Sequence, residues 1–261
     1  MRLSPDQIER FVADGFVKLE GAFSRQTAAA CREILWRDLK LSPERPDGWT
    51  EPVLRLGMYA DPPFREAASS PVLKEALNQL VGGERWVPFQ ALGQMVVRFP
   101  SDKAPWDDGW HIDGSFPPND DFTSTDWIQW RVNFVSRGRA MLMLFLFSDC
   151  GEDDAPTRVR IGSHLPMARQ LAAHGDAGIS LEDLAREGFE SSANCDVRLA
   201  TGEAGTVWLL HPFLVHAAQA HRGRTPRFLA QPGLGPRAPL QIEGDGAFSP
   251  VERAIRLALG C

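Results

Sequence analysis

The feature that most constrains the fold of this chain is a set of metal-ligand-type residues far apart in the sequence. His111 and Asp113 are separated by one residue, and His216 follows about a hundred residues later. Because a strand places residues i and i+2 on one face, His111 and Asp113 can point at the same ion. Two imidazoles and one carboxylate form the facial triad typical of non-haem Fe(II) sites, which leaves other coordination positions open. A third ligand from so distant a segment requires strands that return to one place.

The His-x-Asp pair alone is weak evidence. The chain has six histidines and 34 acidic residues, so a His-x-acidic triplet is expected by chance roughly once. A second such triplet, His174 and Asp176, lies in a segment typical of a helix end that runs into a turn. His111 instead follows the strand-like segment 94–99. We therefore take His111 and Asp113 as candidate metal ligands.

Two histidines compete for the third ligand position. In segment 205–218, Pro212 interrupts the hydrogen-bond ladder, which predicts a strand, a turn with His211 and a second strand with His216. Residues 221–226 have turn composition, and a strand-like segment starts at Arg227.

The relation between His216 and Arg227 favours His216. A hairpin centred near residue 223 would place Arg227 about three residues along from His216, or roughly 10 Å at ~3.3 Å per residue. A guanidinium at that distance suits the far carboxylate of a metal-chelated 2-oxoglutarate, which it can bind as a bidentate fork. An ordinary solvated arginine beside a turn is the alternative for Arg227.

With these residues the sequence resembles the phytanoyl-CoA dioxygenase-like family of Fe(II)/2-oxoglutarate-dependent oxygenases. The likeness runs over most of the chain and rests on segments in the family's order, namely 3–19, 111–113, 155–164 and 205–227. The resemblance implies an α+β fold with a double-stranded β-helix (jelly-roll, cupin-like) core and N-terminal helices packed on it. It implies Fe(II) on His111, Asp113 and His216, and 2-oxoglutarate on Arg227.

The activity that the resemblance implies is that of an oxidoreductase. Such a dioxygenase uses O2 as cosubstrate, hydroxylates a small-molecule metabolite and releases succinate and CO2. Asp113 favours hydroxylation over halogenation, because halogenating relatives have a small residue at the carboxylate position and bind chloride there. Desaturation, epoxidation and cyclisation stay open.

One detail departs from the family pattern. Many members follow the distal histidine with Gly-Ser, whose hydroxyl can help to bind the cosubstrate carboxylate, whereas this chain has Ala217 and Ala218. We expect that partner to come from elsewhere, and Thr157, Gln94 and Asn133 are the candidates.

The pattern of apolar residues predicts helices early in the chain and strands later. We expect one domain over 1–261, with an N-terminal helical part of about 1–85, a core of about 86–235 and a C-terminal extension over 236–261. The helices are expected from Ser4, over 24–39, around 71–80 and near 180–187, with a short strand over 16–19. The later strands are expected at about 86–99, 128–135, 140–148, 157–161, 206–210, 213–219 and 227–233.

Composition limits the partners. A net charge of −6 disfavours a nucleic-acid surface, since phosphate binding needs clustered cations. The sequence has no apolar run of membrane length and no secretory signal, so we expect a cytoplasmic protein with no membrane partner. The four cysteines lack metal-type spacing and are expected to be reduced. No compact basic patch suits an acyl-CoA, which favours a small metabolite without phosphates unless Arg55, Arg98 and Arg131 converge.

Two other classes of function stay open. The first is a non-catalytic or zinc-dependent jelly-roll protein that binds a small ligand. The second is a dioxygenase that needs no cosubstrate, or a hydrolase that uses zinc at the same triad. Arg227 separates the binding protein from the oxygenase, because a metal binder alone needs no guanidinium at that distance. Stoichiometric conversion of 2-oxoglutarate to succinate would exclude both classes. The oligomeric state is not predicted.

Overall fold

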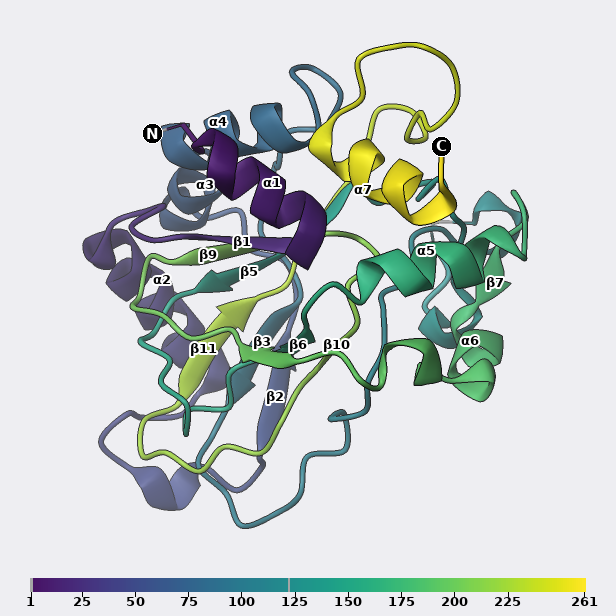
Figure 1. Ribbon diagram of the computed structural model, residues 1–261. Helices are drawn as coiled ribbons and strands as arrows, with labels where there is room; N and C mark the ends of the chain where they lie inside the picture. The colour runs from purple at the N-terminus through teal and green to yellow at the C-terminus, as the bar shows by residue number, and fades with distance from the viewer. Residues whose placement is uncertain (1, 122) are drawn as a thin grey trace.

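The structure is a computed structural model that describes residues 2–121 and 123–261. Antiparallel sheets form its centre and helices pack around them (Figure 1). The largest sheet among the described residues has seven strands. In spatial order these are β1 (Phe16–Leu19), β9 (Val207–Leu210), β5 (Met141–Leu146), β11 (Arg227–Ala230), β3 (Met95–Arg98) and β2 (Val53–Leu56), and β12 (Gly233–Leu234) also pairs with β5.

Two smaller antiparallel sheets complete the β structure of the described chain. One contains β10 (His216–Ala217), β6 (Arg158–Arg160) and β8 (Val197–Leu199), and the other pairs β4 (Arg131–Val132) with β7 (Ile179–Ser180). Val159 of β6 packs in one cluster with Leu144 of β5 and Leu229 of β11. The three-stranded sheet therefore faces the large sheet across an apolar layer.

Strand β5 explains how the large sheet is covered on both sides. All six of its residues are buried. Successive side chains of a strand point to opposite faces, and here Met143 and Phe145 join the larger apolar cluster while Leu142 and Leu144 join the one between the sheets. A continuous apolar run is the sequence pattern of a strand buried on both faces.

The helices lie around the sheets in Figure 1. Helices α2 (Arg25–Leu39), α3 (Pro62–Ala68) and α4 (Pro71–Leu80) contribute buried residues to the larger cluster, as do alternate residues of the large sheet. Helix α7 (Pro250–Leu259) contacts both α1 (Pro5–Asp14) and α5 (His164–Ala172), and α6 (Leu181–Glu187) follows β7. Short 3-10 helices lie at Pro46–Gly48, Pro118–Asp120, Trp127–Gln129 and Glu190–Ser192.

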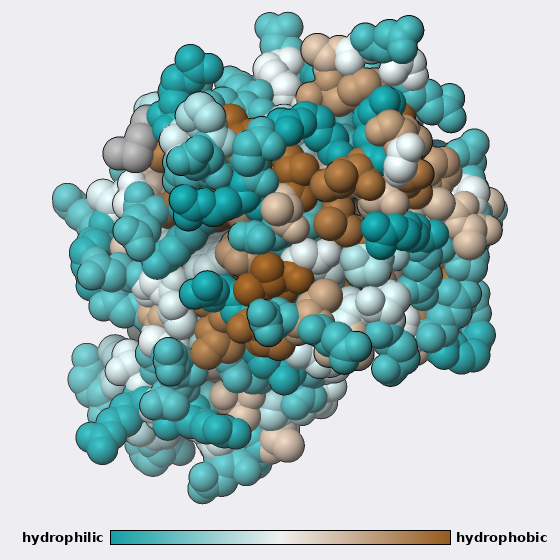
Figure 2. All heavy atoms as spheres, viewed as in Figure 1, coloured by the Kyte–Doolittle hydropathy of each residue, from teal (hydrophilic) through white to brown (hydrophobic). Residues whose placement is uncertain are grey.

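Hydrophilic residues surround this framework. On the face shown in Figure 2 they cover most of the periphery, whereas apolar residues gather towards the middle of the view. None of the helices in the described part of the chain has the length and apolar character needed to cross a bilayer.

The predicted α+β class and the helices at 24–39, 71–80 and 180–187 are confirmed, and so is the strand over 16–19. The helix expected from Ser4 is also confirmed: Ser4 and Gln7 form a capping box, and Pro5 occupies the first turn. Helices α3 and α7 were not predicted, and α7 lies within the expected C-terminal extension. The helix end expected before His174 is the end of α5, whose start was not predicted. Strand β2 also lies in the part for which mainly helices were expected.

Several predicted strands are too long. Segment 86–99 is regular only at β3, because Pro88 has no N–H and Gln94 has a φ of 54°. Segment 227–233 divides into β11 and β12 at Pro232, which cannot donate to the ladder. Segments 128–135 and 213–219 shrink to the two-residue strands β4 and β10.

The predicted hairpin between His216 and Arg227 is wrong. Strand β10 pairs with β6, whereas β11 pairs with β3 and β5. The turn segment between them carries the chain from the small sheet to the large one. His216 and Arg227 therefore approach the same space from two facing sheets.

Candidate active site

His111 and His216 are direct partners across two backbone segments. Each donates its backbone N–H to the carbonyl of the other at 2.9 Å, which forms an isolated antiparallel bridge. Residues that are directly opposite in such a pair project to the same face. Their ring centroids accordingly lie 4.4 Å apart, so the bridge rather than a long strand brings the two imidazoles together.

Backbone carbonyls orient both imidazoles. Nδ1 of His111 lies 2.8 Å from the carbonyl oxygen of Gly109, and Nδ1 of His216 lies 2.9 Å from that of Leu214. A carbonyl only accepts hydrogen bonds, so Nδ1 of each ring carries the proton and Nε2 of the neutral ring has a free lone pair. This arrangement is common among metal-binding histidines, whose other nitrogen donates to a fixed acceptor.

Asp113 completes the cluster. Its Oδ1 lies 4.0 Å from Nε2 of His111 and 3.9 Å from Nε2 of His216, and its Oδ2 lies 3.4 Å from Nη1 of Arg139. Burial alone would raise the pKa of Asp113, but Arg139 and the two imidazoles outweigh it and lower the pKa. Burial and the neighbouring His111 lower the pKa of His216 to about 4. At neutral pH the cluster therefore presents one carboxylate and unprotonated Nε2 of His216.

These three side chains could hold a metal ion. One ligand atom from each lies within 4.8 Å of the others, and the described residues contain no second group of this kind. Two imidazole nitrogens and a carboxylate oxygen suit a divalent first-row metal. The donor set therefore fits an ion at this position.

A cavity of about 100 Å³ joins the cluster to arginines of the large sheet. Its lining comprises Arg55, Gln94, Arg98, Asp107, His111, Asp113, Thr157, His216, Ala218, Arg227 and Gln231. Successive side chains of a strand point to opposite faces, which explains which strand residues line the cavity. Phe228 of β11 and Val97 of β3 belong to the larger apolar cluster, on the side of the helices. Arg227 and Arg98 therefore project from the opposite face, towards the small sheet.

Arg227 is buried with most of its donors unused. It is 2% exposed, its Nη1 donates to the carbonyl of Ala155, and its Nε has no hydrogen-bond partner among the described residues. Burial lowers the pKa of Arg227 to about 10, and a contribution from Arg98 adds to the lowering. The guanidinium stays charged at neutral pH. A buried cation with unpaired N–H groups that lines a cavity is suited to an anion.

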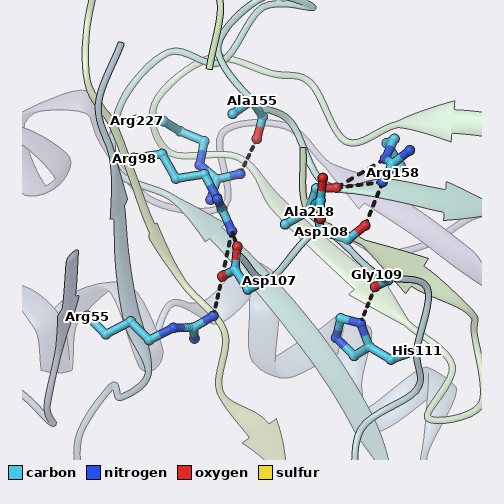
Figure 3. Close-up of polar contacts among 10 residues, drawn as sticks. All are labelled: Arg55, Arg98, Asp107, Asp108, Gly109, His111, Ala155, Arg158, Ala218 and Arg227. Carbon is cyan, nitrogen blue, oxygen red and sulfur yellow. Dashed lines mark hydrogen bonds and ion pairs between the residues drawn. The ribbon is translucent and has the colours of Figure 1, made fainter. Parts of the chain in front are cut away.

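Asp107 links two further arginines at the same end of the cavity (Figure 3). Its oxygens accept from Nη2 of Arg98 at 2.7 and 2.8 Å, and one also accepts from Nη2 of Arg55. Burial lowers the pKa of Arg98, and Asp107 partly opposes this effect. Of the three arginines considered as a cluster from the sequence, Arg55 and Arg98 thus converge, whereas Arg131 donates to the carbonyls of Ala177 and Gly178.

The structure separates the other sequence candidates. Thr157 and Gln94 line the cavity. Asn133 does not: its Nδ2 donates to the carbonyl of Asp176 and its Oδ1 accepts from the N–H of Arg137. His211 lies elsewhere, buried with its ring centroid 4.8 Å from that of His164. His174 follows the end of α5 and lies beside Glu187.

Sequence reasoning missed Asp107, Arg139 and Gln231. Gln231 lies four residues after Arg227, and the period of two along a strand offered a signal for it. Asp107 lies in an irregular segment and Arg139 in a turn before β5, where no periodicity indicates direction. Their positions depend on tertiary contacts, so we find no sequence signal for them.

Comparisons with known proteins support the fold. The sequence matches no family profile and no curated protein. The structure of HygX from Streptomyces hygroscopicus with nickel and 2-oxoglutarate bound is similar, with a TM-score of 0.54 at 19% identity over 95% of this chain and 97% of HygX. The non-heme alpha ketoglutarate (2-oxoglutarate) dependent carbocyclase SnoK from nogalamycin biosynthesis gives a TM-score of 0.57 at 15% identity over 90% and 84% of the two chains.

A third similar structure is the epimerase SnoN in complex with Fe3+, alpha ketoglutarate and nogalamycin RO, with a TM-score of 0.56 at 16% identity over 88% of this chain and 82% of SnoN. At these identities the likeness establishes the fold. The chain therefore shares its α+β fold with non-haem iron and 2-oxoglutarate-dependent enzymes.

Proposed function

We propose that this chain is a non-haem Fe(II)- and 2-oxoglutarate-dependent dioxygenase with a jelly-roll core, which hydroxylates a small molecule. One observation carries the proposal: the buried, incompletely hydrogen-bonded Arg227 lines the same cavity as His111, Asp113 and His216. A metal-binding protein without a cosubstrate has no use for that guanidinium. Burying it without an anion costs free energy.

His111, Asp113 and His216 would hold the iron. Their Nε2 atoms and carboxylate face one another, and the carbonyls of Gly109 and Leu214 fix the ring orientations. Arg139 lies 3.4 Å from Oδ2 of Asp113 and donates from Nη2 to the carbonyl of Gly114 at 2.8 Å. We infer that Arg139 positions the Asp113 carboxylate.

Arg227 would bind the distal carboxylate of 2-oxoglutarate, with its unused N–H groups as donors. The Thr157 hydroxyl and the Gln94 amide also line the cavity and supply polar partners for the rest of the cosubstrate. When iron and 2-oxoglutarate are bound, they supply the oxidising chemistry by which O2 is activated and 2-oxoglutarate becomes succinate and CO2. The chain's residues would position these groups.

Asp113 supports hydroxylation over halogenation, since a carboxylate occupies the position that a chloride would need. The named activities of SnoK and SnoN, a carbocyclase and an epimerase, show that proteins of this fold also direct oxidation to other outcomes. The outcome depends on how the substrate lies relative to the metal. The mass of the product separates these outcomes: hydroxylation adds one oxygen atom, cyclisation removes two hydrogen atoms and epimerisation changes nothing.

The test is the conversion of 2-oxoglutarate to succinate by the protein supplied with Fe(II) and O2. We expect slow conversion without substrate, abolished by His216→Ala. We also expect Arg227→Gln to raise the 2-oxoglutarate concentration needed for half-maximal rate. Circular dichroism checks that each variant is folded. A folded, metal-loaded wild type that converts no 2-oxoglutarate would contradict the proposal and favour a zinc-dependent or purely ligand-binding protein.

A further inference from the structure

We propose that the substrate is a small organic acid with an apolar body, whose carboxylate is bound by Arg55 at the rim of the cavity. This inference deepens the proposed function and rests on it. It depends on the position of Arg55, on the charge that the cavity leaves unbalanced and on the exposed apolar side chains beside it.

Arg55 differs from the other arginines of the cavity in its access to solvent. Its side chain is 47% exposed, whereas those of Arg98 and Arg227 are nearly inaccessible. It lies on β2 opposite Val96 of β3, so it projects from the same face of the sheet as that residue. In Figure 3 its side chain extends towards Asp107. A molecule that enters from solvent can therefore reach Arg55.

Asp107 neutralises Arg55 only in part. Both oxygens of Asp107 accept from Nη2 of the buried Arg98, and the same carboxylate also accepts from Nη2 of Arg55. One negative charge is thus shared by two guanidinium ions. The other N–H groups of Arg55 have no hydrogen-bond acceptor among the described residues, which leaves them available to a second carboxylate.

The formal charge of the complete site also favours a substrate with a carboxylate. The cavity is lined by three arginines against Asp107 and Asp113, and Arg139 pairs with Asp113 from outside the lining. A divalent metal and the dianion 2-oxoglutarate cancel each other, so the site keeps an excess of positive charge. An unbalanced charge in a partly desolvated cavity is costly. A substrate with a carboxylate would reduce this excess, whereas a cationic substrate would add to it.

Apolar side chains beside Arg55 indicate the rest of the molecule. The Arg55 guanidinium carbon lies 5.4 Å from the centroid of the Trp106 ring, and Trp106 is 73% exposed. Met58, three residues after Arg55, is equally exposed and lies over Gly93, next to the cavity residue Gln94. Large apolar side chains left exposed around a cavity are typical of a binding surface. They suit an aromatic or aliphatic body attached to the carboxylate.

A purely structural role for Arg55 is the alternative, in which it only holds the segment around Asp107. The chain offers a matched control for this alternative. Arg137 is 46% exposed, pairs with Asp120 and lies 5.1 Å from the centroid of the Phe116 ring, yet it does not line the cavity. Replacing Arg137 removes the same kind of ion pair and ring contact away from the site.

The experiment uses the full chain loaded with Ni(II), which does not support turnover, and with saturating 2-oxoglutarate. Benzoate, phenylacetate and 3-phenylpropionate are each titrated by calorimetry beside their primary amides, which keep the shape and lack the charge. We expect at least one acid to bind 10-fold or more tightly than its amide. We expect Arg55→Gln to abolish that preference, Arg55→Lys to retain part of it and Arg137→Gln to leave it intact.

Two results would overturn the inference: no acid is preferred over its amide, or the preference survives in Arg55→Gln. Both are distinguishable from failure of the proposed function, because the same samples report 2-oxoglutarate binding before any acid is added. Normal 2-oxoglutarate binding without acid preference contradicts only the role of Arg55. Absence of 2-oxoglutarate binding contradicts the proposed function itself.

Discussion

Arg227 and Arg98 lie directly opposite each other on the antiparallel strands β11 and β3, and both are only 2% exposed. Two adjacent buried cations repel one another and lose their hydration. Asp107 is bound to Arg98 and leaves Arg227 without a carboxylate partner among the described residues. The sheet thus holds the positively charged guanidinium of Arg227 at one end of the cavity, where an anionic cosubstrate would supply the negative charge that it lacks.

The first prediction concerns this position. Arg227→Gln should weaken 2-oxoglutarate binding by about 100-fold or more, because a bidentate pair of charge-assisted hydrogen bonds is worth about 3 kcal/mol or more. Arg227→Lys keeps the charge but loses the planar fork, so a loss of about 10-fold is expected. Calorimetry on the metal-loaded protein measures both. Arg222→Gln, at an exposed arginine, is the control, and equal affinities in all variants would contradict the assignment.

The second prediction concerns the metal. Asp113→Asn keeps the shape of the side chain but removes the charge of the proposed ligand, so affinity for Co(II) should fall by about 100-fold. The chain contains its own control in the other His-x-Asp triplet: Asp176→Asn should leave Co(II) affinity unchanged. Visible absorption of bound Co(II) reports both titrations. Equal losses in the two variants would show that Asp113 has no special role.

Part of this site was predictable because its geometry is local. The single-residue spacing of His111 and Asp113 predicted that they would lie together, and the structure places their ligand atoms close to each other. The segment is not a regular strand, since His111 takes part only in an isolated bridge to His216. Burial on both faces similarly made β5 recognisable as a continuous apolar run.

The rest could not be predicted because it depends on which segments pair. A hairpin was the simplest arrangement for the chain between His216 and Arg227, but β10 and β11 pair with different partners and lie in different sheets. The amino-acid composition of a turn does not indicate whether the chain turns back on itself or crosses to another sheet. Asp107 and Arg139 lie outside regular strands for the same reason, so only tertiary contacts bring them to the cavity.

A third prediction tests how the fold supports the segment before β9. Gly205 has a φ of 98°, and a Cβ there would lie 2.2 Å from the carbonyl oxygen of Phe23. Gly205→Ala should lower the free energy of unfolding by about 2–4 kcal/mol, through unfavourable backbone geometry and a backbone clash. Gly21→Ala, at a φ of 60° with open space around the built Cβ, should cost only about 1 kcal/mol. Denaturant unfolding gives both values, and equal losses would exclude the clash.

A fourth prediction concerns stability in acid. Burial lowers the pKa of His164 to about 4, although its Nε2 contacts the carbonyl of Val12, and burial likewise lowers the pKa of the neighbouring His211. Below an unfolded pKa of about 6.5 the unfolded chain takes up a proton that the folded protein refuses. Stability is therefore complete above that pH and falls towards pH 4, by about 1.4 kcal/mol per pH unit for each such histidine.

His164→Gln should reduce this slope in the metal-free protein by the contribution of one histidine. Denaturant unfolding at a series of pH values between 4 and 7 measures this slope. His174→Gln, which removes a more exposed imidazole, is the matched control. An unchanged slope in His164→Gln would show that His164 is protonated in the folded protein.

The most direct test of the central claim is anaerobic titration of the Fe(II)-loaded protein with 2-oxoglutarate, followed by visible absorption. Chelation of 2-oxoglutarate by iron on His111, Asp113 and His216 predicts a weak metal-to-ligand charge-transfer band that saturates with added cosubstrate. In Arg227→Ala the band should require a much higher 2-oxoglutarate concentration. Bound iron without any such band in the wild-type protein would contradict the account.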